Sequence, residues 1–429
     1  MSRRSTRPAP FSPEGGESAA KRRMSGRPSP GPAVAGPPSH RFAGRGVCTA
    51  MIFVLATSLH AGVIGDPSRG QLLFVSKGCV QCHAVRGAGG RIGPDLGRSS
   101  MKGSFFEIVA AMWNHAPTMQ EKMSELRLMR PRFEGTELSD LLAFLYFLNY
   151  FDEPGDARSG KSLFAEKHCI ECHAIGREGG HSGPRLDAFP RGTPPLQIAQ
   201  DLWNHGPAMT SMMRARNLAV PTFRGNEIID LFAYVRSNGE RRAPRAFKSA
   251  GDPDKGKSVF TAKGCSRCHS VFGRGGSIGP DLGRTELRGS VTQLAGRMWN
   301  HWSAMSGAME SMGMSTPVFR DEELADVFAW LFVSRYDAAT DSTPERGATV
   351  YREKRCASCH GMRGEGGIGP PLPSVSGATK EEIARRMWNH APEMGARMND
   401  RQIAWPRFTS DEFAALIRFL SHDTTGRIQ

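Results

Sequence analysis

Residues 79–83 read Cys-Val-Gln-Cys-His, and the same Cys-x-x-Cys-His pattern returns three more times along the chain. Eight of the nine cysteines fall in these pentapeptides: Cys79 and Cys82, Cys169 and Cys172, Cys265 and Cys268, Cys356 and Cys359. The histidines that complete them are His83, His173, His269 and His360. The ninth cysteine, Cys48, stands apart near the N-terminus. The spacing of the cysteines, more than their number, indicates their purpose.

Similarity between the four segments extends well beyond the pentapeptide. Each has a glycine nine residues before its first cysteine: Gly70, Gly160, Gly256 and Gly347. An aromatic residue lies five positions before that cysteine, and the motifs Gly-Pro-x-Leu, Trp-Asn-His and Pro-x-Phe follow the pentapeptide in the same order each time. The chain therefore holds four homologous units of about 92 residues, long enough for independent domains and too long for solenoid repeats.

Each unit is expected to form three helices separated by glycine-rich loops, with no convincing strand pattern. The first helix runs from the repeated glycine into the first cysteine. The second leads into Trp-Asn-His, and capping boxes precede it at Ser104/Glu107, Ser290/Gln293 and Thr379/Glu382. The third begins at Glu137, Glu227, Glu323 and Glu412, with an aromatic residue seven positions on. The predicted fold class is all-α, with domains at 62–153 (unit 1), 154–246 (unit 2), 247–340 (unit 3) and 341–429 (unit 4).

Residues 1–61 differ in composition from the rest. The stretch up to Arg45 is rich in Arg, Pro, Ser and Gly and is expected to be disordered. From Val47 to Leu59 comes a short apolar segment behind two arginines, which fits a secretory signal cleaved after Ala61. The alternative is an uncleaved membrane tether. In either case the remainder is predicted to be exported, to the periplasm or beyond.

The basic leader also inflates the net charge of +14. It holds nine of the 56 Lys and Arg and two of the 42 Asp and Glu, which leaves 47 basic and 40 acidic residues and a net charge of +7 in the rest. No basic stripe or base-stacking aromatic motif accompanies that residual charge. A nucleic-acid partner is therefore not expected.

Cys-x-x-Cys-His is the attachment signature of c-type haem, in which two thiols add to the vinyl groups and the histidine binds the iron from the proximal side. The rival interpretations are a thioredoxin-like redox pair, which lacks its strand–helix setting here, and zinc sites that share two cysteine pairs. Four copies, one per unit and each with its histidine, favour four covalently bound haem c groups. A buried porphyrin would also supply the apolar mass that three short helices lack.

With these motifs in place, each unit resembles a class I cytochrome c domain over essentially its whole length. The resemblance rests on the Gly-x-x-x-aromatic helix before the pentapeptide, the Gly-Pro-x-Leu loop and the Glu-Leu/Ile-x-x-Leu-x-Ala-aromatic terminal helix. It implies that each loop proline accepts a hydrogen bond from the proximal histidine through its carbonyl: Pro94, Pro184, Pro280 and Pro370. The four Trp-Asn-His tryptophans are expected to pack on haem or bind its propionates.

The distal ligand stays open at this stage, because the position directly before Pro-x-Phe, where the family often has methionine, holds Arg130, Val220, Thr316 and Trp405. The favoured candidates lie four residues past the Trp-Asn-His histidine: Met119, Met209, Met305 and Met394. A second methionine series lies four residues further on: Met123, Met213, Met309 and Met398. The histidines themselves are the third choice: His115, His205, His301 and His390.

Haem iron with two axial ligands does not bind substrate without losing one, so the expected function is that of an electron carrier and not of an enzyme. Donor and acceptor would be redox partner proteins, which the sequence does not identify. The alternative is a multihaem peroxidase or reductase in which three haems feed one open-site haem. Units 3 and 4 depart most from the shared pattern, so an open site would be sought there.

Overall fold

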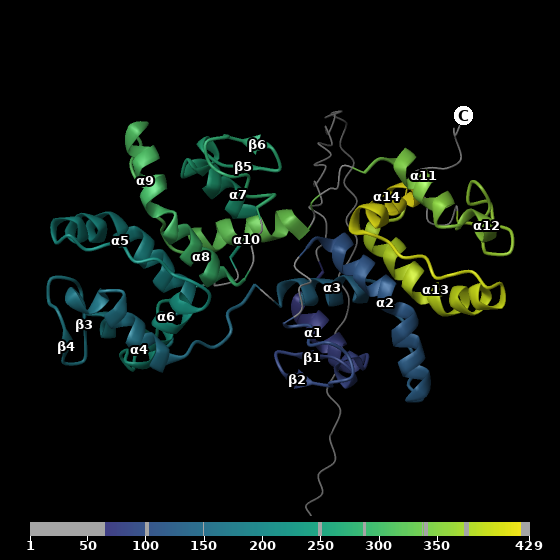
Figure 1. The fold of residues 1–429 in the computed structure, drawn as a ribbon, viewed down its shortest axis with the longest axis horizontal. Coiled ribbons are helices and arrows are strands. Elements are labelled where there is room, and N and C mark those ends of the chain that lie inside the picture. Colours follow the sequence, from purple (N-terminus) through teal and green to yellow (C-terminus); the bar gives the residue numbers. More distant parts are fainter. Residues whose placement is uncertain are drawn as a thin grey trace, which may run out of the picture. The chain divides into compact units, whose positions relative to one another are not determined.

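The computed structural model describes residues 65–98, 103–148, 150–247, 251–285, 289–336, 338, 342–372 and 377–421. Helices dominate this part of the chain, as the sequence predicts (Figure 1). The described residues all belong to one compact unit of the chain. The expected basic extension and signal sequence at 1–61 lie outside the described residues.

The first two units share one order of elements. Unit 1 contains α1 (Pro67–Ser76), η1 (Cys79–Gln81), β1 (Ala84–Val85), β2 (Ala88–Gly89), α2 (Phe105–Glu125) and α3 (Glu137–Phe147). Unit 2 contains α4 (Ala157–Glu166), η2 (Cys169–Glu171), β3 (Ala174–Ile175), β4 (Glu178–Gly179), η3 (Leu186–Ala188), α5 (Pro195–Ala215) and α6 (Glu227–Ser237).

The last two units depart from that order in different places. Unit 3 contains α7 (Pro253–Ala262), η4 (Cys265–Arg267), β5 (Ser270–Val271), β6 (Arg274–Gly275), α8 (Val291–Asn300), α9 (Trp302–Ser311) and α10 (Glu323–Tyr336), so its second helix is broken at His301. Unit 4 contains α11 (Pro344–Glu353), α12 (Ala357–His360), α13 (Lys380–Asp400) and α14 (Ser410–Ser421).

The first and last helices of each unit cross in backbone contact at the repeated glycine. A Cβ on Gly160 would lie only 2.0 Å from the carbonyl oxygen of Asp230 in α6, and the same clash recurs at 2.0 Å for Gly70, 2.0 Å for Gly256 and 2.1 Å for Gly347. Beside each glycine the two repeated aromatic rings meet, with centroids 5.1 to 5.7 Å apart: Phe74 with Phe144, Phe164 with Tyr234, Phe260 with Trp330, and Tyr351 with Phe419. This crossing explains why both residues recur.

An aspartate of the last helix, buried in units 1 and 3, holds the start of the first helix in units 1 to 3. The backbone N–H of Asp66 donates to Oδ1 of Asp140 at 2.7 Å, and the same bond forms in units 2 and 3. Asp66 in turn caps α1, since its side chain accepts from the N–H groups of Ser68 and Arg69. The carboxylate of Asp140 therefore fixes the start of α1, and the carboxylate of Asp66 accepts from the first free N–H groups of that helix.

The second helix is the longest element, with 21 residues in α2, α5 and α13. Of the three predicted capping boxes, the one at Ser290 and Gln293 forms in full. At Thr379 the side chain accepts from the N–H of Glu382, whereas the side chain of Ser104 makes no capping hydrogen bond. The third helix starts at the predicted glutamate in units 1 to 3 and two residues before Glu412 in unit 4.

Two-residue antiparallel hairpins follow the pentapeptide in units 1 to 3, and the sequence did not predict them. They are too short to show a strand pattern. Their glycines adopt positive φ, as at Gly87 (84°) and Gly89 (126°), so that the chain can reverse directly after the histidine. In unit 4, which is one residue shorter here, the described residues after His360 form turns without a strand pair, and the pentapeptide itself contains the short helix α12.

Among the described residues, no helix combines the length and the apolar character needed to cross a membrane.

Replacing Gly160 by alanine is expected to destabilise the holoprotein by about 1–3 kcal/mol, because the added methyl forces α4 and α6 apart. The matched control is Gly307→Ala in α9, where a Cβ meets nothing within 4 Å and helix propensity favours alanine by about 1 kcal/mol. Denaturant unfolding followed at the Soret band measures both. Equal stability of the Gly160→Ala protein and its parent would contradict the tight crossing.

Candidate functional site

In every unit the Gly-Pro loop anchors the pentapeptide histidine. The Nδ1 atom lies within hydrogen-bond distance of the proline carbonyl oxygen: 3.0 Å for His83, 2.7 Å for His173, 3.0 Å for His269 and 2.9 Å for His360. Because a carbonyl only accepts, Nδ1 must carry the proton, and Nε2 keeps a bare lone pair for a metal. The bonds expected for Pro94, Pro184, Pro280 and Pro370 are thus confirmed.

The glycine before each proline leaves room for the imidazole. A Cβ on Gly93 would lie 2.4 Å from Cε1 of His83, and the corresponding distances are 2.6 Å at Gly183, 2.4 Å at Gly279 and 2.8 Å at Gly369. A side chain at this position would therefore push the ring away from the loop. The motif is Gly-Pro because the glycine provides the space and the proline provides the acceptor.

None of the eight pentapeptide cysteines is paired in a disulfide. Burial raises the pKa of the first thiol of each pair to about 11: Cys79, Cys169, Cys265 and Cys356. Within the described ranges, no three His, Cys, Asp or Glu side chains are gathered as a metal site would require. The shared-zinc interpretation thus finds no geometric support.

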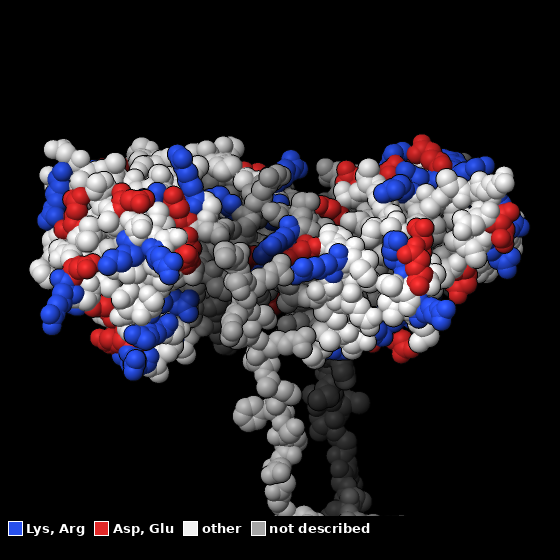
Figure 2. Space-filling model, turned by 60° about the horizontal axis from the view of Figure 1, so that its bottom comes forward, with Lys and Arg blue, Asp and Glu red and all other residues white. Residues whose placement is uncertain are grey.

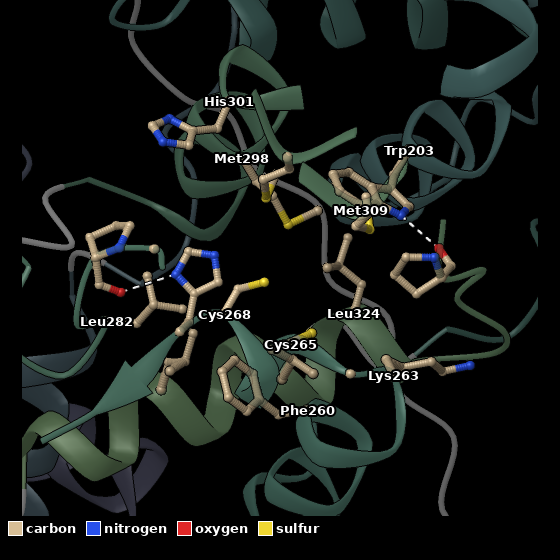
Figure 3. A pocket seen from close by; sticks show the side chains of 18 of the residues that line it. Trp203, Phe260, Lys263, Cys265, Cys268, Leu282, Met298, His301, Met309 and Leu324 are labelled. Atoms are coloured by element: carbon tan, nitrogen blue, oxygen red, sulfur yellow. Dashed lines mark hydrogen bonds between the residues drawn. The ribbon is translucent and has the colours of Figure 1, made fainter. Parts of the chain in front are cut away.

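An apolar cavity opens beside the pentapeptide. In unit 3 it measures about 440 Å³, and Figure 3 shows Cys265, Cys268 and Phe260 along one side of it with Leu282 and Leu324 nearby. In unit 2 a cavity of about 300 Å³ is lined by Cys169 and His173 together with apolar side chains. Two thiols and a bare imidazole nitrogen on the wall of an apolar space fit a covalently attached porphyrin.

The second helix provides metal-ligating side chains on the other side of the cavity. In three units the Trp-Asn-His histidine faces the proximal one, with ring centroids 6.5 Å apart for His115 and His83, 6.2 Å for His205 and His173, and 6.3 Å for His390 and His360. Partial burial and the facing imidazole lower the pKa of His115 and His205.

The favoured methionine series lies on the same helices. Its four members are partly buried and pack against the apolar core: Met119, Met209, Met305 and Met394. In unit 3, Met305 of this series lines the cavity together with Met298 and with Met309 of the second series. Their role as distal ligands stays a prediction.

A family model described as cytochrome c matches residues 67–147, 157–239, 253–332 and 344–423, about three quarters of the chain. The chain belongs to the cytochrome c family. It is similar to cytochrome c4 of Azotobacter vinelandii, with 27 % identity over 168 residues, 35 % of this chain and 77 % of that protein. No solved structure matches it. Its four cytochrome c domains, each with a Cys-x-x-Cys-His pair, bind four haem c groups covalently.

The cytochrome c domains associate in pairs through their Trp-Asn-His motifs. Between units 2 and 3, the indole N–H of Trp203 donates to the carbonyl of Pro317 at 2.9 Å, and that of Trp299 donates to Pro221 at 2.8 Å. Asn204 brackets the backbone of Phe319, donating to its carbonyl at 2.7 Å and accepting from its N–H at 2.9 Å. Asn300 does the same for Phe223. The contact is reciprocal, so the Pro-x-Phe of one unit receives the Trp-Asn of the other.

The same reciprocal contact joins units 1 and 4, at opposite ends of the chain. Trp113 donates to the Pro406 carbonyl at 2.8 Å and Trp388 to that of Pro131 at 2.9 Å. Asn114 and Asn389 bracket the phenylalanines two residues after those prolines, as in the other pair. The domains thus form an inner pair (units 2 and 3) and an outer pair (units 1 and 4). The sequence did not predict this arrangement.

In the inner pair each tryptophan lines the haem cavity of the neighbouring unit. Trp203 of unit 2 borders the cavity of unit 3, and Trp299 of unit 3 borders that of unit 2. Figure 3 shows Trp203 at the far end of the unit 3 cavity from His301. The sequence predicted haem-packing tryptophans but not that they serve the partner's haem. The reciprocal wall brings the two cavities next to each other.

Aromatic side chains of units 1 and 3 connect the two pairs. The hydroxyl of Tyr146 in α3 donates to the carbonyl of Phe332 in α10 at 2.7 Å, and its ring lies 4.8 Å from that of Tyr336. Next to it the carbonyl of Tyr150 accepts from the N–H of Val291 at 2.9 Å. Contacts of these residues in units 1 and 3 therefore link the two pairs in addition to the covalent chain.

Replacing Asn204 by alanine is expected to lower the free energy of unfolding by about 1–3 kcal/mol, because it leaves the Phe319 N–H and carbonyl unpaired at the interface. The control is Asn238→Ala, whose amide donates within its own unit to the Tyr234 carbonyl. Denaturant unfolding of the holoproteins compares them. A loss no greater in Asn204→Ala than in Asn238→Ala would argue against a stabilising bracket.

Proposed function

We propose that this multihaem cytochrome is a tetrahaem carrier of single electrons between redox partner proteins in the periplasm, and not an enzyme. The observation that carries the proposal is the presence of metal-ligating side chains on both sides of the haem site in each unit. On one side stands the anchored pentapeptide histidine, and on the other the second helix with its histidine and methionines. The haem iron supplies a one-electron couple when bound.

The protein's own residues orient the iron ligand and limit the access of water to the haem site. Each proline carbonyl fixes the tautomer and direction of the proximal ring, so that little rearrangement accompanies a change in iron charge. Buried side chains of the second and third helices, such as Ile108 (1 % exposed) and Leu142 (0 %), keep water from the core. The paired tryptophan walls set two cavities side by side, which supports electron exchange within the inner pair.

Surface charge supports brief docking of partners better than one permanent complex. On the face shown in Figure 2, basic and acidic side chains are interspersed over the described residues, with no large area of a single sign. Weak redox encounters use small interfaces of this kind. The periplasmic location rests on the expected signal sequence at 47–61 and on haem attachment of the c type.

The function is tested on the reduced holoprotein with carbon monoxide and peroxide. We expect four haems per chain by pyridine haemochrome, no carbon monoxide adduct, no peroxide turnover, and oxidation by four equivalents of a one-electron acceptor. A carbon monoxide adduct on one quarter of the haems together with peroxide turnover would instead support the enzyme alternative. N-terminal sequencing of exported protein checks cleavage after Ala61, and protein retained in the cytoplasm would contradict the location.

A further inference from the structure

The four haem sites differ in what faces the proximal histidine. In units 1, 2 and 4 the second helix is one continuous run of 21 residues, and its histidine ring lies 6.2 to 6.5 Å from the proximal ring, centroid to centroid. In the described part of unit 3, no such ring contact joins His269 and His301. One site is therefore built differently from the other three.

The observed spacing is that of two imidazoles on one metal ion. A metal–imidazole bond is about 2 Å long and the ring centre lies about 1 Å beyond the nitrogen, so two rings on opposite sides of one metal have centroids about 6 Å apart. Three independent units agree with this value within a few tenths of an ångström. Each proximal ring already spends Nδ1 on its proline carbonyl, so Nε2 is the nitrogen left to face the metal.

Unit 3 lacks this arrangement because of the residue after its histidine. Where units 1, 2 and 4 have the small residues Ala116, Gly206 and Ala391, unit 3 has Trp302. Its indole is 2 % exposed and packs between pair-interface rings, with centroids 4.9 Å from Trp203 and 6.2 Å from Trp299. The backbone at His301 has ψ of −6°, far from the helical value of about −42°, and this ends α8.

Methionines occupy the cavity of unit 3. Met298 of α8 and Met305 of α9 line it together with His269 and His301, and they lie three residues before and four residues after His301. Figure 3 shows Met298 pointing into the cavity and His301 at its edge. Thioethers thus line the distal side of this cavity, whereas His301, also on its wall, makes no ring contact with His269 in the described structure.

We propose that the protein holds three bis-histidine haems, with His115, His205 and His390 as distal ligands, and one histidine–methionine haem in unit 3, ligated by Met298 or Met305. Methionine ligation raises the reduction potential relative to histidine, so unit 3 is the site where the first electron resides. This deepens the proposed carrier function, and it can fail while that function stands, because four histidine–methionine haems would also form a carrier.

Near-infrared magnetic circular dichroism of the oxidised holoprotein tests the ligand count, since the sulfur-to-iron charge-transfer band arises only from methionine-ligated haem. We expect the intensity of one such haem in four, and a potentiometric titration in which one quarter of the haem is reduced at higher potential than the rest. Intensity corresponding to four methionine-ligated haems, or to none, overturns the proposal.

Variants locate the ligands. His205→Ala is expected to turn one quarter of the haem high-spin without changing the charge-transfer band. Met209→Leu removes the rival ligand in the same unit and is expected to leave both spin state and band unchanged. Either Met298→Leu or Met305→Leu is expected to abolish the band. Retention of the band in both leucine variants, or an all-low-spin His205→Ala protein, would refute the assignment. Haem content per chain, measured on each variant, separates a lost ligand from a lost haem.

Discussion

Each unit is organised around the hydrogen bond from the proximal imidazole to a proline carbonyl. That bond requires a loop which approaches the ring so closely that only glycine fits before the proline, with a Cβ at Gly93 falling 2.4 Å from the His83 ring. The loop leaves one side of the apolar cavity beside the proximal histidine open, and the second helix covers that side. Helix crossing at the repeated glycine holds the second helix's neighbours in place. The protein alone therefore orients the metal-binding nitrogen of the proximal histidine.

Local chemistry made much of this predictable. The pentapeptide, the Gly-Pro loop and the Glu137, Glu227 and Glu323 helix starts follow from residue types at short spacing, and the structure places them as expected. The hairpins after the pentapeptide were missed because two residues carry no periodicity. Pairing of the units was missed for a different reason: the acceptors are backbone carbonyls, at Pro131 and Pro406 for example, and their bonds join residues 257 and 293 positions apart.

The distal ligand shows where sequence reasoning stops. His205 and Met209 stand four residues apart on one helix, so both lie on the face that covers the cavity, and spacing does not separate them. What distinguishes the histidine is a ring contact: in units 1, 2 and 4, where a small residue follows it, its ring lies 6.2 to 6.5 Å from the proximal ring. The presence of Trp302 in unit 3 was visible in the sequence, but its effect depends on Trp203 and Trp299, which only the paired structure brings to it.

Along the chain, the inner pair (units 2 and 3) is inserted between the two members of the outer pair (units 1 and 4). Units 2 and 3 are neighbours in the chain, and their Asn brackets join residues 77 to 115 positions apart, whereas those of units 1 and 4 join residues 256 to 294 positions apart. During synthesis from the N-terminus, the inner pair is complete once about three quarters of the chain has been made. At that stage unit 1 has no partner, and its Trp113 and Asn114 are uncovered. Because long-range contacts form slowly, association of units 1 and 4 comes last and is the final step of assembly. A chain truncated after unit 3 would contain the complete inner pair and only unit 1 of the outer pair.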